Sequence, residues 1–96
     1  MKRVVLECRD LFFRGKLQEV IRRAGAETVS AEPCELAVIE LGSSTALERI
    51  RDLAGRAVPV LAFGSHVDAA GLRAARELGA RAVPNSEIEN SLRALL

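Results

Sequence analysis

Aromatic side chains are scarce in this sequence of 96 residues, which has three Phe and neither Tyr nor Trp. Surfaces that bind single-stranded nucleic acid stack bases on exposed aromatic rings, so this scarcity argues against such a surface. Runs of like charge are also missing, because the 14 basic and 13 acidic residues are spread along the chain. With a net charge of +1, neither a nucleic acid nor an anionic membrane is indicated as a partner.

Cysteine is rare too. Cys8 and Cys34 are not spaced as a metal-binding pair and no second cluster of ligands accompanies them, so neither a metal site nor a cofactor is predicted. The sequence shows no signal peptide and no apolar stretch of about 18 residues. We therefore expect a cytoplasmic protein in which both thiols are reduced.

Aliphatic residues dominate what remains. Hydrophobic residues make up 49% of the chain and charged residues 28%, which allows a core and argues against disorder. The length predicts a single domain over residues 1–96. A core built mainly from Ala, Val, Leu and Ile suits a sheet covered by helices.

Short β-rich apolar runs alternate with amphipathic segments of helical period, which is typical of a parallel sheet with crossover helices. The pattern predicts strands over residues 3–8, 27–30, 36–41, 58–63 and 81–83. Helices are predicted after Asp10, Thr45, Asp68 and Ser86. The fold class is therefore α/β, with a single doubly wound five-stranded parallel sheet in the order 2-1-3-4-5.

The predicted helix starts carry capping signals. Asp10 and Asp68 are N-cap residues, whereas Thr45 with Glu48 and Ser86 with Glu89 have the spacing of a capping box. Residues expected to face the core are Phe13, Leu17, Val20, Ile21 and Ala24, then Leu47, Ile50 and Leu53, then Leu72, Ala75 and Leu78, and finally Ile88, Leu92 and Leu95.

Gly71 falls inside the helix that follows Asp68, where it costs up to about 1 kcal/mol relative to Ala. It marks either close packing against a partner or another helix, or a tolerated imperfection.

One connection does not fit a regular doubly wound plan. Only four residues, 31–34, lie between Ser30 at the end of the second predicted strand and Glu35 just before the third, whereas a crossover helix needs ten or more residues. Either the second helix has shrunk to a loop, or the second strand is very short or displaced. We favour the shortened or missing helix.

Three segments carry a resemblance to a known family. Residues 35–41 are similar to the third strand of response-regulator receiver domains, residues 58–63 to their fourth strand, and residues 74–80 to the end of their fourth helix. The resemblance covers nearly the whole chain except the second helix. It implies a receiver-like, flavodoxin-like fold and a place in two-component signalling, although this fold hosts many activities.

The same resemblance implies a degenerate pseudo-receiver, because the positions that carry phosphotransfer differ. Receivers hold Mg²⁺ with an acid pair after the first strand and accept the phosphoryl group on an Asp that ends the third; a hydroxyl after the fourth strand and a Lys after the fifth complete the site. In this chain the residues at these positions are Cys8 and Arg9 for the acid pair, Glu40 for the acceptor, Gly64 for the hydroxyl and Ser86 for the Lys. Asp10 lies one position beyond the acid pair, and Val83 stands where receivers usually have a switch aromatic.

Glu40 is one methylene longer than Asp, which misplaces its oxygen for in-line transfer. It either holds a permanent negative charge near the position of a phosphoryl group or pairs with Arg9 at the strand ends.

Polar residues that follow the strands should meet at the carboxyl edge of the sheet, where open α/β sheets bind ligands. Gly64 permits close backbone approach, Ser65 offers a hydroxyl and His66 offers an imidazole, the side-chain type used most often as a proton carrier. His66 is alternatively a solvated or capping residue, and Asn85 either contacts a ligand or only ends a strand. The candidate ligand-binding residues are Cys8, Arg9, Glu40, Gly64, Ser65, His66, Asn85 and Ser86.

Cys8 and Arg14 also have the Cys-x5-Arg spacing of tyrosine phosphatases, in which a thiolate attacks phosphorus. That loop should be small and rich in Gly so that its N–H groups surround phosphate, whereas this chain has Leu-Phe-Phe at residues 11–13. Coincidence is the better interpretation, and Cys8 then simply ends a strand.

These observations favour a phosphorylation-independent regulatory module rather than an enzyme. It would bind an unidentified protein through the face made by residues 68–78, 81–83 and 86–95, and the resemblance makes a homodimer through this region plausible. One alternative is a sensor of small anions or nucleotides at the carboxyl edge. Another is an enzyme that depends on Cys8 or His66, although no second catalytic partner is evident beside either residue.

Overall fold

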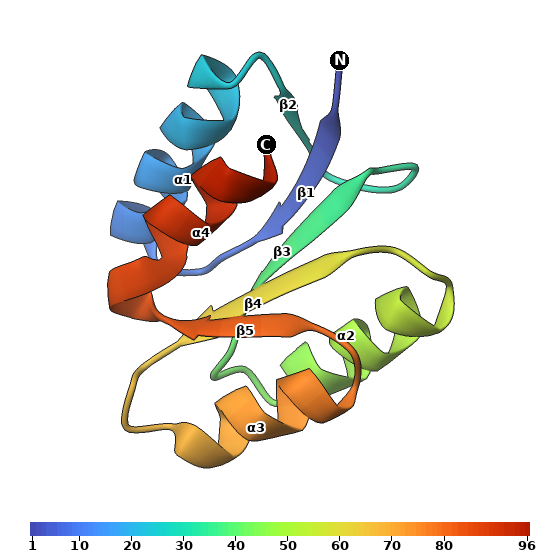
Figure 1. Cartoon of the computed structure of the whole chain (residues 1–96), viewed down its shortest axis with the longest axis vertical. Helices are drawn as coiled ribbons and strands as arrows, with labels where there is room; N and C mark the ends of the chain where they lie inside the picture. The colour runs from blue at the N-terminus through green and yellow to red at the C-terminus, as the bar shows by residue number, and fades with distance from the viewer.

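The computed structural model of the protein describes residues 1–96 and contains the predicted five-stranded parallel sheet in the order β2-β1-β3-β4-β5. Helices α1 and α4 cover one face of the sheet, and α2 and α3 cover the other (Figure 1). The predicted fold class is confirmed. In chain order the elements are β1 (Arg3–Glu7), α1 (Leu11–Arg23), β2 (Glu27–Val29), β3 (Leu36–Glu40), α2 (Ala46–Gly55), β4 (Val60–Gly64), α3 (Ala69–Glu77), β5 (Arg81–Pro84), the 3₁₀ turn η1 (Asn85–Glu87) and α4 (Ile88–Leu95).

No helix connects β2 to β3, as predicted, and β2 is short as well. Residues 30–35 form a loop over the side of the sheet that carries α2. Ion pairs attach this loop to the helix, because the Arg56 guanidinium contacts Glu32 at 2.7 Å and Asp52 at 2.6 Å. Val29 and Cys34 are partly buried against the core on this side, so the loop takes over part of the covering role of a helix.

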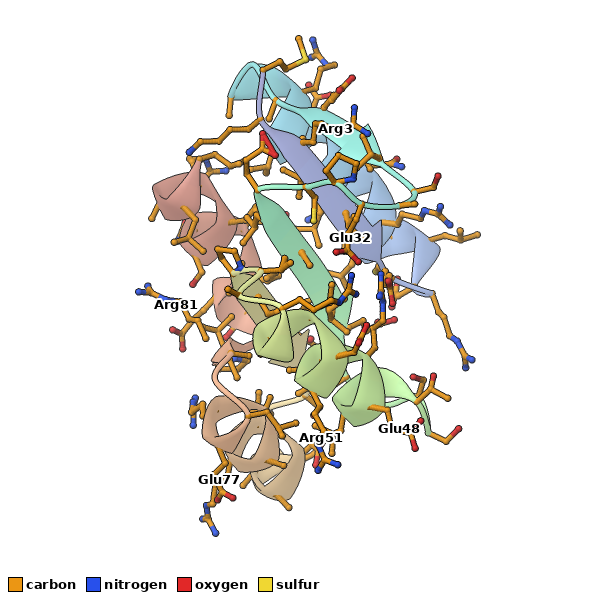
Figure 2. The ribbon with its side chains drawn as sticks, turned by 90° about the vertical axis from the view of Figure 1, so that its right-hand side faces the viewer. Arg3, Glu32, Glu48, Arg51, Glu77 and Arg81 are labelled. Carbon is orange, nitrogen blue, oxygen red and sulfur yellow. The ribbon has the colours of Figure 1, made fainter.

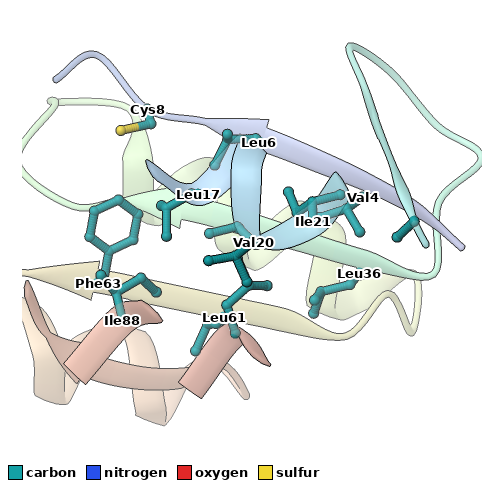
Figure 3. Close-up of a cluster of buried hydrophobic side chains, with 13 residues drawn as sticks. Val4, Leu6, Cys8, Leu17, Val20, Ile21, Leu36, Leu61, Phe63 and Ile88 are labelled. Carbon is teal, nitrogen blue, oxygen red and sulfur yellow. The ribbon is translucent and has the colours of Figure 1, made fainter. Parts of the chain in front are cut away.

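The face under α1 and α4 is packed with large side chains. Figure 3 shows this cluster, in which Val4 and Leu6 of β1 alternate toward α1, and Cys8 lies at the end nearest the carboxyl edge of the sheet. Phe63 is fully buried, and its ring lies 5.8 Å from that of Phe13 on α1. The clusters on the two faces hold 13 buried residues each, so it is the larger size of the side chains that places more of the core volume on this face.

The face under α2 and α3 is packed with smaller residues. Ala37, Ala62 and Ala82 of three neighbouring strands are buried there against Ala75 of α3. Because alanine side chains are short, they allow a helix to approach the sheet closely on this face. No helix of the protein is long and apolar enough to cross a membrane.

Two of the predicted helix caps are confirmed and two are wrong. The Asp10 carboxylate accepts the N–H groups of Phe12 and Phe13, and the Asp68 carboxylate accepts that of Gly71. Thr45 has a helical backbone conformation (φ −108°, ψ −2°) and makes no side-chain cap, because capping needs the extended conformation. Ser86 lies inside η1, so α4 starts at Ile88, one residue later than a capping box at Ser86 requires.

Two predicted core positions are also wrong. Leu47 is exposed, because α2 begins at Ala46 and buries Ala46, Ile50 and Leu53 at helical spacing, which turns Leu47 outward. Ala24 is exposed because it lies beyond the last turn of α1.

Gly71 has a local explanation within its own helix. A Cβ atom built on it would lie 2.2 Å from the Asp68 carboxylate oxygen, and its N–H donates to the same carboxylate at 3.0 Å. The glycine therefore leaves room for the cap of α3, so neither a partner nor another helix is needed to account for it.

Candidate functional site

The carboxyl ends of β1 and β3 flank a hollow of about 540 Å³ at the edge of the sheet. The predicted site residues Cys8, Arg9 and Glu40 all line it. Cys8 and Glu40 point to the α1 side of the sheet, because they continue the alternation of Leu6 and Val38. The rule that parallel strands bring their carboxyl ends together therefore places these three residues correctly.

Glu40 is held in place by backbone rather than by an ion pair. Its Oε1 accepts the N–H of Arg9 at 2.8 Å, and no guanidinium lies within salt-bridge distance of its carboxylate. Glu40 and Arg9 do meet at the strand ends, but through a hydrogen bond between carboxylate and backbone amide and not through an ion pair of their side chains. This bond links the ends of β1 and β3 across the hollow.

Cys8 has the environment of an unreactive thiol. Burial raises its pKa to about 11, and the negative charge of Glu40 acts in the same direction. The Sγ also lies 3.4 Å from the carbonyl oxygen of Asp10, to which the thiol donates. Since the thiolate is the nucleophilic form of cysteine, Cys8 is poorly suited to covalent catalysis near neutral pH.

The Cys-x5-Arg spacing does bring its two ends together, because Arg14 lines the same hollow as Cys8. The segment between them is nevertheless not a phosphate loop. Residues from Leu11 onward are helical, and the Asp10 carboxylate occupies two N–H groups at the start of α1, those of Phe12 and Phe13. An anion between Cys8 and Arg14 would therefore not find the ring of free amides that this chemistry requires.

Several residues of the hollow escaped sequence reasoning. Arg49 of α2 reaches it, and its Nε donates to Glu7 Oε2 at 2.6 Å. Glu7 ends β1 on the face opposite Cys8, and Arg49 lies one turn into α2. To predict this pair from the sequence, both the strand alternation and the exact first residue of α2 would have to be known. Ser43 and Thr45 supply hydroxyl groups from the loop before α2.

The other predicted site residues lie elsewhere. Asn85 and Ser86 line a separate hollow of about 320 Å³, together with Phe13, Lys16, Glu89 and Asn90. Gly64 is buried against Leu41, and a Cβ atom there would lie 3.1 Å from that side chain. Ser65 and His66 are exposed and line neither hollow; the Ser65 hydroxyl accepts the N–H of Val67 at 3.3 Å. The predicted set is thus divided among several places along the carboxyl edge.

The hollow offers a poor ligand set for a divalent cation. Mg²⁺ requires hard oxygen ligands, but Cys8 contributes a protonated thiol and Arg9 a positive charge. The carboxylate of Glu7 is engaged by Arg49, which leaves Glu40 as the one remaining acid of the lining. No group of three or more His, Cys, Asp or Glu residues in the structure is arranged to hold a metal ion.

Solved structures of receiver domains share this fold, although no protein-family model and no curated protein matches the sequence. A BeF3-activated DrrB receiver domain has a TM-score of 0.82 at 15% identity, over 99% of this chain and 93% of that chain. The receiver domain of NtrX from Brucella abortus has a TM-score of 0.78 at 15% identity, over 97% and 92% of the two chains. The receiver domain of the Francisella response regulator 1452 has a TM-score of 0.76 at 10% identity, over 99% and 96%. At these identities the likeness establishes a receiver-like fold.

Proposed function

We propose that this chain is a receiver-like regulatory module that acts by protein–protein interaction and does not depend on phosphorylation. The proposal is supported by the residues at the carboxyl edge of the sheet, which differ from those of a phosphate-accepting receiver. Glu40 ends β3, where a receiver has its acceptor Asp, and its carboxylate is bonded to the Arg9 amide at 2.8 Å. Cys8 and Arg9 follow β1 where a receiver has its acid pair.

This combination removes the two requirements of phosphoryl transfer. Transfer needs a metal ion to neutralise charge on the phosphoryl oxygens, and the lining of this hollow does not suit Mg²⁺. It also needs a carboxylate free to attack in line, whereas Glu40 is longer than Asp and is tethered to the opposite strand end. The proposal includes no catalytic step, because the Cys8 thiol is held protonated and His66 has no hydrogen-bonded partner to act with.

We place the protein-binding face on α3, β5 and α4. Arg73 and Arg81 are exposed there and make no ion pair within the chain, and Figure 2 shows Arg81 projecting away from the ribbon. Arg76 is different. Its Nε and Nη2 donate to the Ala82 carbonyl at 3.2 and 2.8 Å, so it attaches α3 to β5 and its replacement would disturb the fold as well as any interface.

Affinity capture from an extract of the source cells tests the face. The proposal predicts a protein that is retained by the unmodified chain and lost from Arg73→Glu and Arg81→Glu, with or without a phosphodonor. Arg51→Glu is the matched control, because Arg51 is an exposed arginine without an ion pair that belongs to α2 and not to α3, β5 or α4. Equal retention by all variants would contradict the assignment of the face.

The second experiment addresses phosphorylation-independent behaviour. Amide spectra of the ¹⁵N-labelled protein are recorded while Mg²⁺ and then acetyl phosphate are added. We expect the signals of Glu40 and β5 to stay in place when Mg²⁺ is added, and no new set of β5 signals to grow in with acetyl phosphate, because the hollow does not hold the cation and Glu40 does not accept a phosphoryl group. A saturable shift at these amides would contradict the proposal.

A further inference from the structure

The first turn of α1 exposes two large apolar side chains. Leu11 is 78% exposed and Phe12 65% exposed, and neither belongs to the core. The Phe12 ring packs edge-on against Phe13 at 5.9 Å, and Lys16 Nζ lies 4.3 Å from its centroid. Adjacent apolar residues exposed at a helix start are costly in water, and such a patch marks a binding surface when polar groups surround it.

Unpaired positive charge lies next to this patch. Arg14 is three residues after Leu11, so the two side chains share a face of α1, and Arg14 lines the hollow at the carboxyl edge together with Arg9. Neither guanidinium makes an ion pair or a hydrogen bond within the chain. The third arginine of the hollow, Arg49, is neutralised by Glu7.

The charges of the hollow favour an anionic group at Arg9 and Arg14. Glu40 is the one acid of the lining without a cationic partner, and one of its oxygens is occupied by the Arg9 amide. The unpaired groups therefore sum to a net positive charge inside a concave surface, where the field is stronger than on an open one.

We propose that Arg9, Leu11, Phe12 and Arg14 form a docking surface, the α1 surface, for a segment of another protein that carries a carboxylate beside an apolar side chain. The carboxylate would enter the hollow between the two guanidinium groups, and the apolar side chain would cover Leu11 and Phe12. A free phosphate ion satisfies only the first half of this surface, because it leaves both apolar side chains in water. A polyanion such as nucleic acid fits poorly, since Asp10 and Glu40 lie among the arginines.

The α1 surface is distinct from the α3–β5–α4 face, so the inference goes beyond the proposed function. It rests on that function only in requiring that the chain acts through protein partners.

Selection from a display library of random linear peptides tests the proposal with the intact chain as bait. We expect enriched peptides to carry Asp or Glu next to Leu, Ile, Val or Phe. A synthetic peptide of the enriched sequence should bind roughly ten-fold more weakly to Arg14→Gln and to Leu11→Ser, because each variant removes one half of the contact. Its affinity should fall as salt is raised, since the charges are near the surface.

Matched controls separate this surface from the alternatives. Both test positions are exposed, and circular dichroism checks that the variants fold. Arg73→Glu lies on the α3–β5–α4 face and should bind the peptide as the unmodified chain does. Loss of binding in Arg73→Glu but not in Arg14→Gln would overturn the α1 surface while supporting the proposed function. Absence of enrichment, or enriched peptides without acidic residues, would also overturn it. Inorganic phosphate binding at Arg9 and Arg14 as tightly as the peptide would reduce the site to an anion pocket.

Discussion

The cap of α3 predicts that Gly71→Ala changes the stability of the unmodified protein and of an Asp68→Ala variant by different amounts. The Asp68 carboxylate accepts the Gly71 N–H at 3.0 Å and occupies the space that a Cβ atom on residue 71 would need, with the nearest oxygen only 2.2 Å away. Gly71→Ala therefore displaces the carboxylate in the unmodified protein. If Asp68 is first replaced by Ala, the three atoms nearest to the new methyl group are removed.

The magnitudes follow from these two contacts. Loss of an Asp N-cap costs about 1 kcal/mol, and Ala in place of Gly inside a helix stabilises by up to about 1 kcal/mol. Gly71→Ala should thus change the free energy of unfolding of the unmodified protein by about 0 kcal/mol, because the two effects cancel. In the Asp68→Ala background the same substitution should stabilise by up to about 1 kcal/mol, so the coupling energy is about 1 kcal/mol.

Urea unfolding of the four proteins measures this coupling, and for a domain of this size 1 kcal/mol also moves the thermal midpoint by about 4–8 °C. Equal stabilisation by Gly71→Ala in both backgrounds would refute the reasoning, because it would mean that the carboxylate does not need the space beside Gly71. Destabilisation in both backgrounds would show that residue 71 packs against something other than Asp68.

Three further predictions concern the thiols, the loop before β3 and α1. In a Cys34→Ser protein at pH 8, Cys8 should be alkylated about 100-fold more slowly than in the urea-unfolded chain, because a pKa near 11 instead of 9.0 leaves that much less thiolate. The pKa of Cys8 is higher in the folded chain than in the unfolded chain, so the stability that the protonated thiol contributes is complete below pH 9 and is lost as the pH rises toward 11. In urea unfolding at increasing pH, the free energy of unfolding should therefore fall less steeply for Cys8→Ala than for the unmodified protein. Glu32→Gln should lower the free energy of unfolding by up to about 1 kcal/mol at low salt and by less at high salt, because Glu32 accepts from Arg56 at 2.7 Å; an equal loss at both salt concentrations would contradict this. Gly15→Ala should raise the thermal midpoint, with a gain of about 0.5–1 kcal/mol, since a Cβ atom there meets nothing within 4 Å; an unchanged or lower midpoint would mean that α1 is constrained at this position.

The sheet could be predicted because its signals are local. Buried parallel strands are short apolar runs, and Val4 to Leu6 or Leu36 to Ile39 are recognisable without knowledge of their neighbours. The missing helix before β3 followed from chain length alone. The exact phase of α2 did not, because Ala46 and Leu47 are both plausible core residues and only packing against the sheet selects Ala46.

The candidate site was predictable where it depends on strand ends and unpredictable where it depends on loops. Cys8, Arg9 and Glu40 meet because β1 and β3 are neighbours in the sheet. Ser65 and His66 follow β4 at the same edge, but the rule for strand ends does not specify the direction of a loop, and these residues lie outside the hollow. Arg49 reaches the hollow from α2 with a long side chain, which leaves no trace in the spacing of the sequence, whereas Arg14 was visible only through its Cys-x5-Arg spacing from Cys8.

The most direct test of phosphorylation independence is the intact mass of the protein after incubation with acetyl phosphate and Mg²⁺. The account predicts that the unmodified chain does not gain the mass of a phosphoryl group, and that Glu40→Asp does not gain it either, because Cys8 and Arg9 cannot hold the metal. A stoichiometric gain of one phosphoryl group that disappears in Glu40→Gln would contradict the account and show that the carboxyl edge of this chain accepts phosphate.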